Sequence, residues 1–223
     1  PATPGKKTPT GTTMTTTRPP PVRLRGTGPF SVDRVSLSNR YLLAVSFVAL
    51  CWLWMQIVHE AGHVIHAQLS GGTVQRVVLH PLTLSRTDVA PNPAARFVAA
   101  GGAIWGVALP LAALVLAARF APHARHVAAF FGCWCLSANV GWLGSGAGYD
   151  IGDSRELLHL GVPKWLLITV GLPAVAAGLH LCNGLGPRFG FGPAAQPVSR
   201  RTAVVMALLL ACTLAAEFLL SSR

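Results

Sequence analysis

The residues best suited to chemistry stand together at His59-Glu60-Ala61-Gly62-His63, an HExxH motif. On a helix, residues four apart project from one face about one turn from each other, so two imidazoles can share one zinc ion at ~2.0–2.1 Å from each nitrogen. Glu60 lies beside that face, where a carboxylate can take a proton from a water whose pKa zinc lowers to ~7. The motif predicts a Zn²⁺ centre with His59 and His63 as ligands and Glu60 as the catalytic base.

The motif lies at the end of a long apolar run, which strengthens this prediction. Ionisable side chains inside an apolar span are costly and rarely retained without a partner, so they mark function. His66 lies on the same helical face, but it stands ~10 Å along the axis from His59, too far to share one ion. We therefore expect His66 to pack or to form a hydrogen bond beside the site.

A catalytic zinc site needs a third protein ligand, and the glycine-rich stretch 139–153 offers two carboxylates. Asp150 and Asp153 lie there, and each also suits a structural role. Asp150 suits a turn, whereas Asp153, with Glu156 three residues later, suits the N-cap of a helix over residues 154–159. A carboxylate has two oxygens, so capping and metal binding are compatible. We expect one of the two to be the third ligand, Asp153 before Asp150.

The elements that carry these residues are strongly apolar. Of the 223 residues, 52% are hydrophobic and 11% are charged, and the mean hydropathy is +0.50. A soluble domain carries about 25% charged residues, so this composition excludes a soluble enzyme. Five runs approach the ~20 residues needed to cross a bilayer. They cover residues 41–58, 97–118, 127–147, 165–182 and 202–220.

These runs predict an all-α polytopic membrane protein with about five transmembrane helices, located in the cell membrane. Between the first two runs, residues 73–79 are rich in β-branched side chains, and residues 82–86 alternate apolar and polar. This pattern predicts a short β-hairpin at the membrane surface. Gly102 and Gly106 form a GxxxG pattern, which predicts close helix packing in the second span.

Residues 1–40 differ from the rest of the chain and are rich in Thr, Pro and basic side chains. With few large apolar residues, such a segment is expected to be a disordered tail before the membrane domain of residues 41–223. The net charge is +11, but no base-reading module accompanies it. A basic tail beside apolar spans more often contacts anionic lipid headgroups, so we expect the lipid bilayer and no nucleic acid as a partner.

An HExxH in a transmembrane helix, a small strand segment after it and a downstream Asn-to-Asp region resemble the site-2 protease family of intramembrane zinc metalloproteases. The resemblance covers residues 41–165 and is specific at the HExxH motif. It implies that His59 and His63 bind zinc, that Glu60 is the general base, and that Asn139 steadies the substrate or the tetrahedral intermediate. It also implies that the strands present an edge to an extended substrate.

The sequence thus predicts an intramembrane zinc-dependent endopeptidase that cleaves a transmembrane or membrane-proximal segment of a membrane protein substrate. The alternative is a non-catalytic zinc-binding membrane protein with a structural or regulatory role. The orientation stays open, because the basic residues favour a cytoplasmic N-terminus and so an external HExxH, whereas the family works near the cytoplasmic face.

Overall fold

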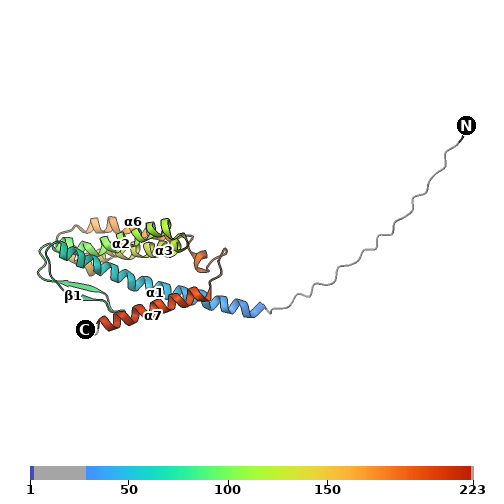
Figure 1. Cartoon of the computed structure of the whole chain (residues 1–223). Coiled ribbons are helices and arrows are strands. Elements are labelled where there is room, and N and C mark those ends of the chain that lie inside the picture. Colours follow the sequence, from blue (N-terminus) through green and yellow to red (C-terminus); the bar gives the residue numbers. More distant parts are fainter. Residues whose placement is uncertain (3–28, 222–223) are drawn as a thin grey trace.

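The computed structural model describes residues 1–2 and 29–221 and confirms a mainly helical chain with one β-hairpin (Figure 1). The long helices form a bundle, and the hairpin lies at the end of the bundle where α7 ends. The elements in chain order are α1 (Pro29–Leu69), β1 (Val74–Val78), β2 (Arg86–Val89), α2 (Ala95–Phe120), η1 (Pro122–Ala124), α3 (Arg125–Cys135), η2 (Leu136–Val140), α4 (Gly141–Tyr149), α5 (Gly152–His159), α6 (Lys164–Cys182), η3 (Gly186–Phe189) and α7 (Arg200–Ser221).

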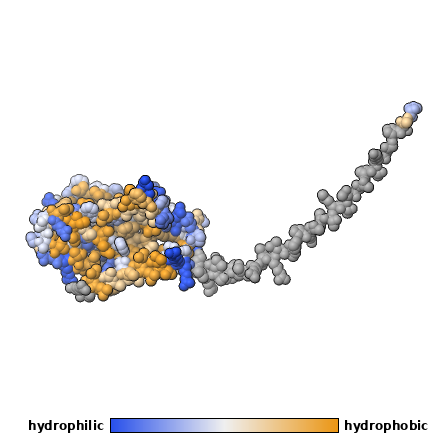
Figure 2. Space-filling model, viewed as in Figure 1, coloured by the Kyte–Doolittle hydropathy of each residue, from blue (hydrophilic) through white to orange (hydrophobic). Residues whose placement is uncertain are grey.

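Five helical segments are long and apolar enough to cross a membrane, as the five apolar runs predicted. They are Leu37–Leu69, Ala95–Phe120, Pro122–Tyr149, Lys164–Cys182 and Arg200–Leu220. Apolar residues cover the middle of the face seen in Figure 2, and polar residues gather toward its two ends. Helix α1 begins at Pro29, earlier than the expected first span at Tyr41. Residues 3–28 of the expected tail lie outside the described residues.

Helix α1 is the central element of the bundle. Of the five segments it is the most buried and α7 is the least buried, although the two run side by side (Figure 1). Toward its N-terminal end, α1 contributes Leu43, Phe47 and Cys51 to an apolar cluster. The rings of Phe47 and Phe189 stack there, with 5.3 Å between their centroids. Large apolar side chains therefore hold this end of α1 in place.

Toward its C-terminal end, α1 packs against α2 through glycines. A Cβ atom added to Gly62 would collide with the carbonyl oxygen of Gly101, so the two backbones lie in direct contact. Gly102, in the GxxxG pattern, faces the HExxH motif. A Cβ atom there would lie 2.5 Å from Nε2 of both His59 and His63. The predicted close packing is confirmed, and it brings α2 against the histidines.

The hairpin lies between the first two spans, as predicted, but its second strand is β2 at residues 86–89, so the predicted position at residues 82–86 is wrong. The strands are antiparallel, with Val78 paired to Arg86. Residues between them form a turn, in which the backbone N–H groups of Leu82 and Thr83 bond to His80. This turn is longer than the sequence pattern suggested, so strand pairing begins later in the chain.

The third span is not one continuous α-helix. Helix α3 passes into the π-helical turn η2, which carries Asn139, and then into α4. Such turns occur often at functional sites. Helix α4 ends at Tyr149, and the residue after it, Asp150, has a left-handed backbone with φ 56°. Helix α5 follows and confirms the helix expected over residues 154–159. The reversal between α4 and α5 brings Asp153 to the HExxH histidines.

Candidate metal centre

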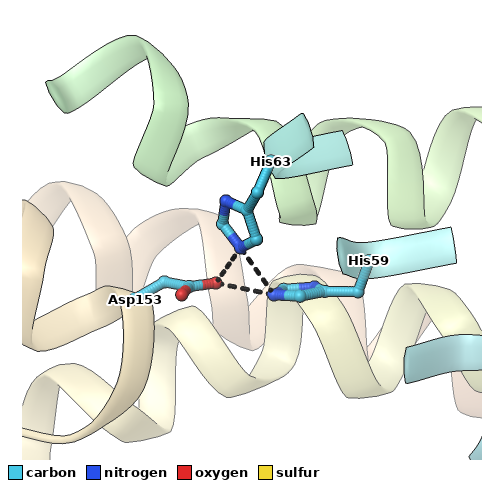
Figure 3. A group of neighbouring side chains, drawn as sticks. All are labelled: His59, His63 and Asp153. Carbon is cyan, nitrogen blue, oxygen red and sulfur yellow. Dashed lines mark hydrogen bonds and ion pairs between the residues drawn. The ribbon is translucent and has the colours of Figure 1, made fainter. Parts of the chain in front are cut away.

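Three side chains converge at the contact between α1, α2 and α5 (Figure 3). His59 Nε2 and His63 Nε2 lie 3.1 Å apart, and Asp153 Oδ2 lies 2.8 Å from the first and 3.5 Å from the second. Each residue offers one ligand atom, and these atoms all lie within 4.8 Å of one another. These three residues, called the ligand group below, could hold a metal ion, as the sequence predicted.

Both imidazole rings are held at the nitrogen that points away from this cluster. His59 Nδ1 is 2.6 Å from Asn139 Oδ1, and His63 Nδ1 is 2.8 Å from the carbonyl oxygen of Val98. Because a carbonyl oxygen only accepts hydrogen bonds, each neutral ring carries its proton on Nδ1 and leaves the Nε2 lone pair free. Two lone pairs and a carboxylate oxygen therefore face one another, an arrangement that a metal cation stabilises.

Asn139 is buried and uses its amide group to orient His59. Its Nδ2 donates to the carbonyl oxygens of Gly106 at 3.1 Å and Cys135 at 2.9 Å, which turns Oδ1 toward the imidazole. Gly106 leaves room for this amide, because a Cβ atom there would lie 2.7 Å from Asn139 Cγ. Asn139 also lines the cavity described below. A contact between Asn139 and a substrate stays a prediction.

Of the two candidate carboxylates, the structure brings Asp153 to the histidines and leaves Asp150 at the surface. The Asp150 side chain is 59% exposed and lies 4.0 Å from Arg155 Nε and from His159 Nε2. The N-cap role predicted for Asp153 is wrong: Ile151 stands at that position, and no side chain caps α5. Burial disfavours the charged form of Asp153, but when the two imidazoles are protonated, hydrogen bonds from their Nε2–H groups outweigh burial and hold the pKa of Asp153 well below its usual range.

Glu60 lies outside the ligand group and has its own partner. Its side chain is buried, and its Oε2 accepts a hydrogen bond from Thr87 Oγ1 in β2 at 2.7 Å. This contact was not foreseen, because nothing in the sequence pairs Thr87 with the motif. The sequence analysis also did not single out Gln56, which is buried one helical turn before Glu60 and accepts a hydrogen bond from the backbone N–H of Ser85. A polar residue at this position of an apolar run was a signal that it has a partner.

His66 is confirmed as a neighbour of the site rather than a member of the ligand group. Its Nδ1 lies 2.6 Å from the carbonyl oxygen of Phe97, and its ring stacks on the Phe97 ring at 3.9 Å between centroids. It therefore fixes the start of α2 against α1.

A cavity of about 620 Å³ opens beside the ligand group. Its walls come from α1, from β1, from the stretch 84–90 that contains β2, and from α2, η2, α4 and α5. Glu60, Asn139 and the three ligand residues all line it, together with the indole rings of Trp52 and Trp142. The cavity can therefore admit a molecule to the ligand group, and the apolar side chains of its wall can contact that molecule.

Comparison of the chain with protein-family models, with curated proteins and with solved structures found no match. The assignment of the site therefore rests on its geometry, and membership of the site-2 protease family stays a prediction from the motif.

Proposed function

We propose that this chain is an intramembrane zinc-dependent endopeptidase of the site-2 protease type. The observation that carries the proposal is the convergence of His59, His63 and Asp153 on one point, beside a buried Glu60 that is not itself a ligand. This set lies in a cavity among helices apolar enough to cross a membrane. It combines a place for the metal, a base next to it and an opening for a substrate.

Zinc is the metal that this donor set favours. Two imidazoles and one carboxylate are a common catalytic zinc set, and they leave a fourth position open. Ligands ~2.0–2.1 Å from a tetrahedral ion lie ~3.3 Å from one another, and the observed separations of 2.8, 3.1 and 3.5 Å bracket that value. A structural zinc site needs a fourth protein ligand, and the group in the described residues has three.

The chain's own residues divide the catalytic work. Bound zinc would lower the pKa of a water molecule to ~7 and polarise a peptide carbonyl. Glu60 takes the proton from the attacking water and delivers it to the leaving amine. Asn139 and the Val98 carbonyl keep the two imidazoles in the tautomer with a free Nε2. The surrounding helices limit the access of bulk water.

An extended peptide is the substrate form that suits the cavity. The residues that contain β2, 84–90, line the cavity without interruption, so the backbone of a substrate can pair with this strand by β-augmentation. The His59 side chain lies ten residues before the end of α1, or ~15 Å along the axis. This depth favours a transmembrane or membrane-proximal segment of a membrane protein as the substrate.

The decisive variant is Glu60→Gln, which removes the base without removing a ligand. We expect cleavage of fluorescein-labelled casein, or of single-pass membrane proteins co-reconstituted in liposomes, to fall to background. Zinc content should stay near that of the wild type, because the side chain at position 60 is not in the ligand group. The matched control is Gln68→Glu, a change between the same two residue types at an exposed position of α1 that does not line the cavity.

Two outcomes would count against the proposal. Cleavage retained by Glu60→Gln would exclude the proposed role of this residue as base. A zinc-loaded wild-type chain that cleaves none of these substrates would favour the alternative, a non-catalytic zinc-binding membrane protein.

A further inference from the structure

Two polar side chains on α1 face β2 and have no part in holding the metal. Gln56 and Glu60 are one helical turn apart, and both are almost fully buried, with exposed fractions of 5% and 3%. Burying an amide and a carboxylate within a membrane-spanning segment is costly unless each finds a partner. Both partners come from one short stretch of the hairpin.

The partners are matched to the helix in spacing. Ser85 donates its backbone N–H to Gln56 Oε1 at 3.1 Å, and Thr87 donates its hydroxyl to Glu60 Oε2 at 2.7 Å. Four residues of a helix rise ~6 Å, and two residues of an extended strand cover ~6.6 Å. The start of β2 can therefore run along α1 with both bonds made at once.

From this match we infer that Gln56 and Thr87 are positioning residues. Together they hold β2 against α1 in one register, and Thr87 also orients the Glu60 carboxylate. The inference rests on the proposed function for its catalytic part, and on the two hydrogen bonds alone for its structural part.

The register has a chemical consequence at Glu60. A slip by one residue would bring Arg86 or Asp88 to the position of Thr87, and it would turn every side chain of the strand to the other face. Asp88 would then place a second carboxylate against Glu60. The hydroxyl of Thr87 instead engages one carboxylate oxygen, and a hydrogen bond to a charged acceptor is among the stronger ones. The other oxygen stays available to take a proton.

The same strand also lines the cavity, so one element aligns both the base and an extended substrate. A substrate that pairs with β2 is thereby placed at a set distance from Glu60. We expect substitution of Thr87 to change kcat more than KM, because its side chain contacts the base Glu60 whereas the backbone of the strand would contact the substrate. Gln56 should act mainly on the rigidity of the strand.

The test compares Thr87→Val, which keeps the shape of the side chain and removes the hydroxyl, with Thr87→Ser, which keeps the hydroxyl. The full chain is purified in detergent with bound zinc, and fluorescein-labelled casein is the substrate. Thr87→Val should lower kcat by about 10- to 100-fold, with KM changed less than about threefold, because one hydrogen bond to a charged group is lost. Thr87→Ser should restore most of kcat. Thr83→Val, at an exposed position in the same hairpin, is the control and should behave as the wild type.

Hydrogen–deuterium exchange provides a readout that does not need activity. Amides of residues 85–89 should exchange about tenfold faster or more in Thr87→Val and in Gln56→Met, whereas zinc content should not change. Wild-type exchange and wild-type kcat in Thr87→Val would overturn the inference. A different result would be that the wild-type chain cleaves no casein while exchange is faster in both variants. That result would contradict the proposed function but support the role of Gln56 and Thr87 in holding β2 against α1.

Discussion

The two ends of α1 are built on different principles. At the end near Phe47, large apolar side chains fill the space between α1, α3 and η3, and the contact is made by ring against ring. At the end near His63, α1 and α2 touch through glycines, and the buried side chains Gln56, Glu60 and His66 each have a hydrogen-bond partner.

This difference determines which side chains can be replaced without loss of structure. Apolar contacts are not directional, so a side chain of similar volume can take the place of another. A buried hydrogen bond needs a particular donor and acceptor, and loss of one partner leaves the other unsatisfied at a cost of about 1–3 kcal/mol. Substitutions of the three residues that could hold the metal, or of residues in contact with them, should therefore change zinc binding sharply, whereas substitutions at the apolar end should change stability alone.

The largest effect is expected from Asp153→Ala, which removes one of three ligands. Zinc affinity, measured by competition with a chelating dye, should fall more than about 100-fold, beyond the 10- to 100-fold loss typical of residues that only orient a ligand. Asp150→Ala is the matched control, because this carboxylate is exposed and lies outside the ligand group. If Asp153→Ala binds zinc as tightly as the wild type, another residue must complete the site.

Gly102→Ala should have the next largest effect, although it adds one methyl group. The new Cβ atom would lie 2.5 Å from Nε2 of both histidines, so either the rings or α2 must move. We expect zinc affinity to fall about 100-fold, since the ligand positions depend on this contact. Gly148→Ala adds the same methyl group to α4 where no atom lies within 4 Å. Equal zinc affinity in the two variants would show that α2 does not shape the site.

Much of this arrangement could be predicted from the sequence, because the signals are local. The apolar runs predict the helices that are long and apolar enough to cross a membrane, and the HExxH spacing predicts two residues of the group that could hold a metal ion. The third ligand was narrowed to Asp150 or Asp153, with Asp153 only slightly favoured, since a pattern of Asp153 followed by Glu156 suits a helix cap as well as a metal ligand. Only the reversal between α4 and α5, a tertiary feature, decides that the carboxylate faces the histidines.

The contacts that could not be predicted depend on register and on helix geometry. The start of β2 depends on the length of the turn after His80, so the pairing of Thr87 with Glu60 is invisible in the sequence. The π-helical turn η2 rotates Asn139 toward His59, and no residue pattern in this stretch indicates such a turn. In both cases the conformation of the backbone that carries the side chain decides its partner.

Asn139→Leu tests whether that orientation matters for the metal. The change removes the acceptor for His59 Nδ1 and the donor for two carbonyl oxygens, so the ring loses its fixed tautomer. We expect zinc affinity to fall about tenfold, at the lower end for a residue that orients a ligand. Ser137→Ala, in the same turn, is the control. Unchanged zinc binding in Asn139→Leu would mean that the helix alone orients His59.

The smallest effect on the metal is expected from Phe47→Leu at the apolar end. Leucine keeps most of the volume but loses the ring stacked on Phe189, at a cost of about 1 kcal/mol. For a chain of this size that loss lowers the melting temperature by about 2–4 °C, which a thermal shift assay in detergent can measure. Zinc affinity should match that of the wild type, because no ligand or ligand partner lies in this cluster. A loss of zinc affinity as large as that of Asn139→Leu would show that packing at one end of α1 controls the metal site at the other.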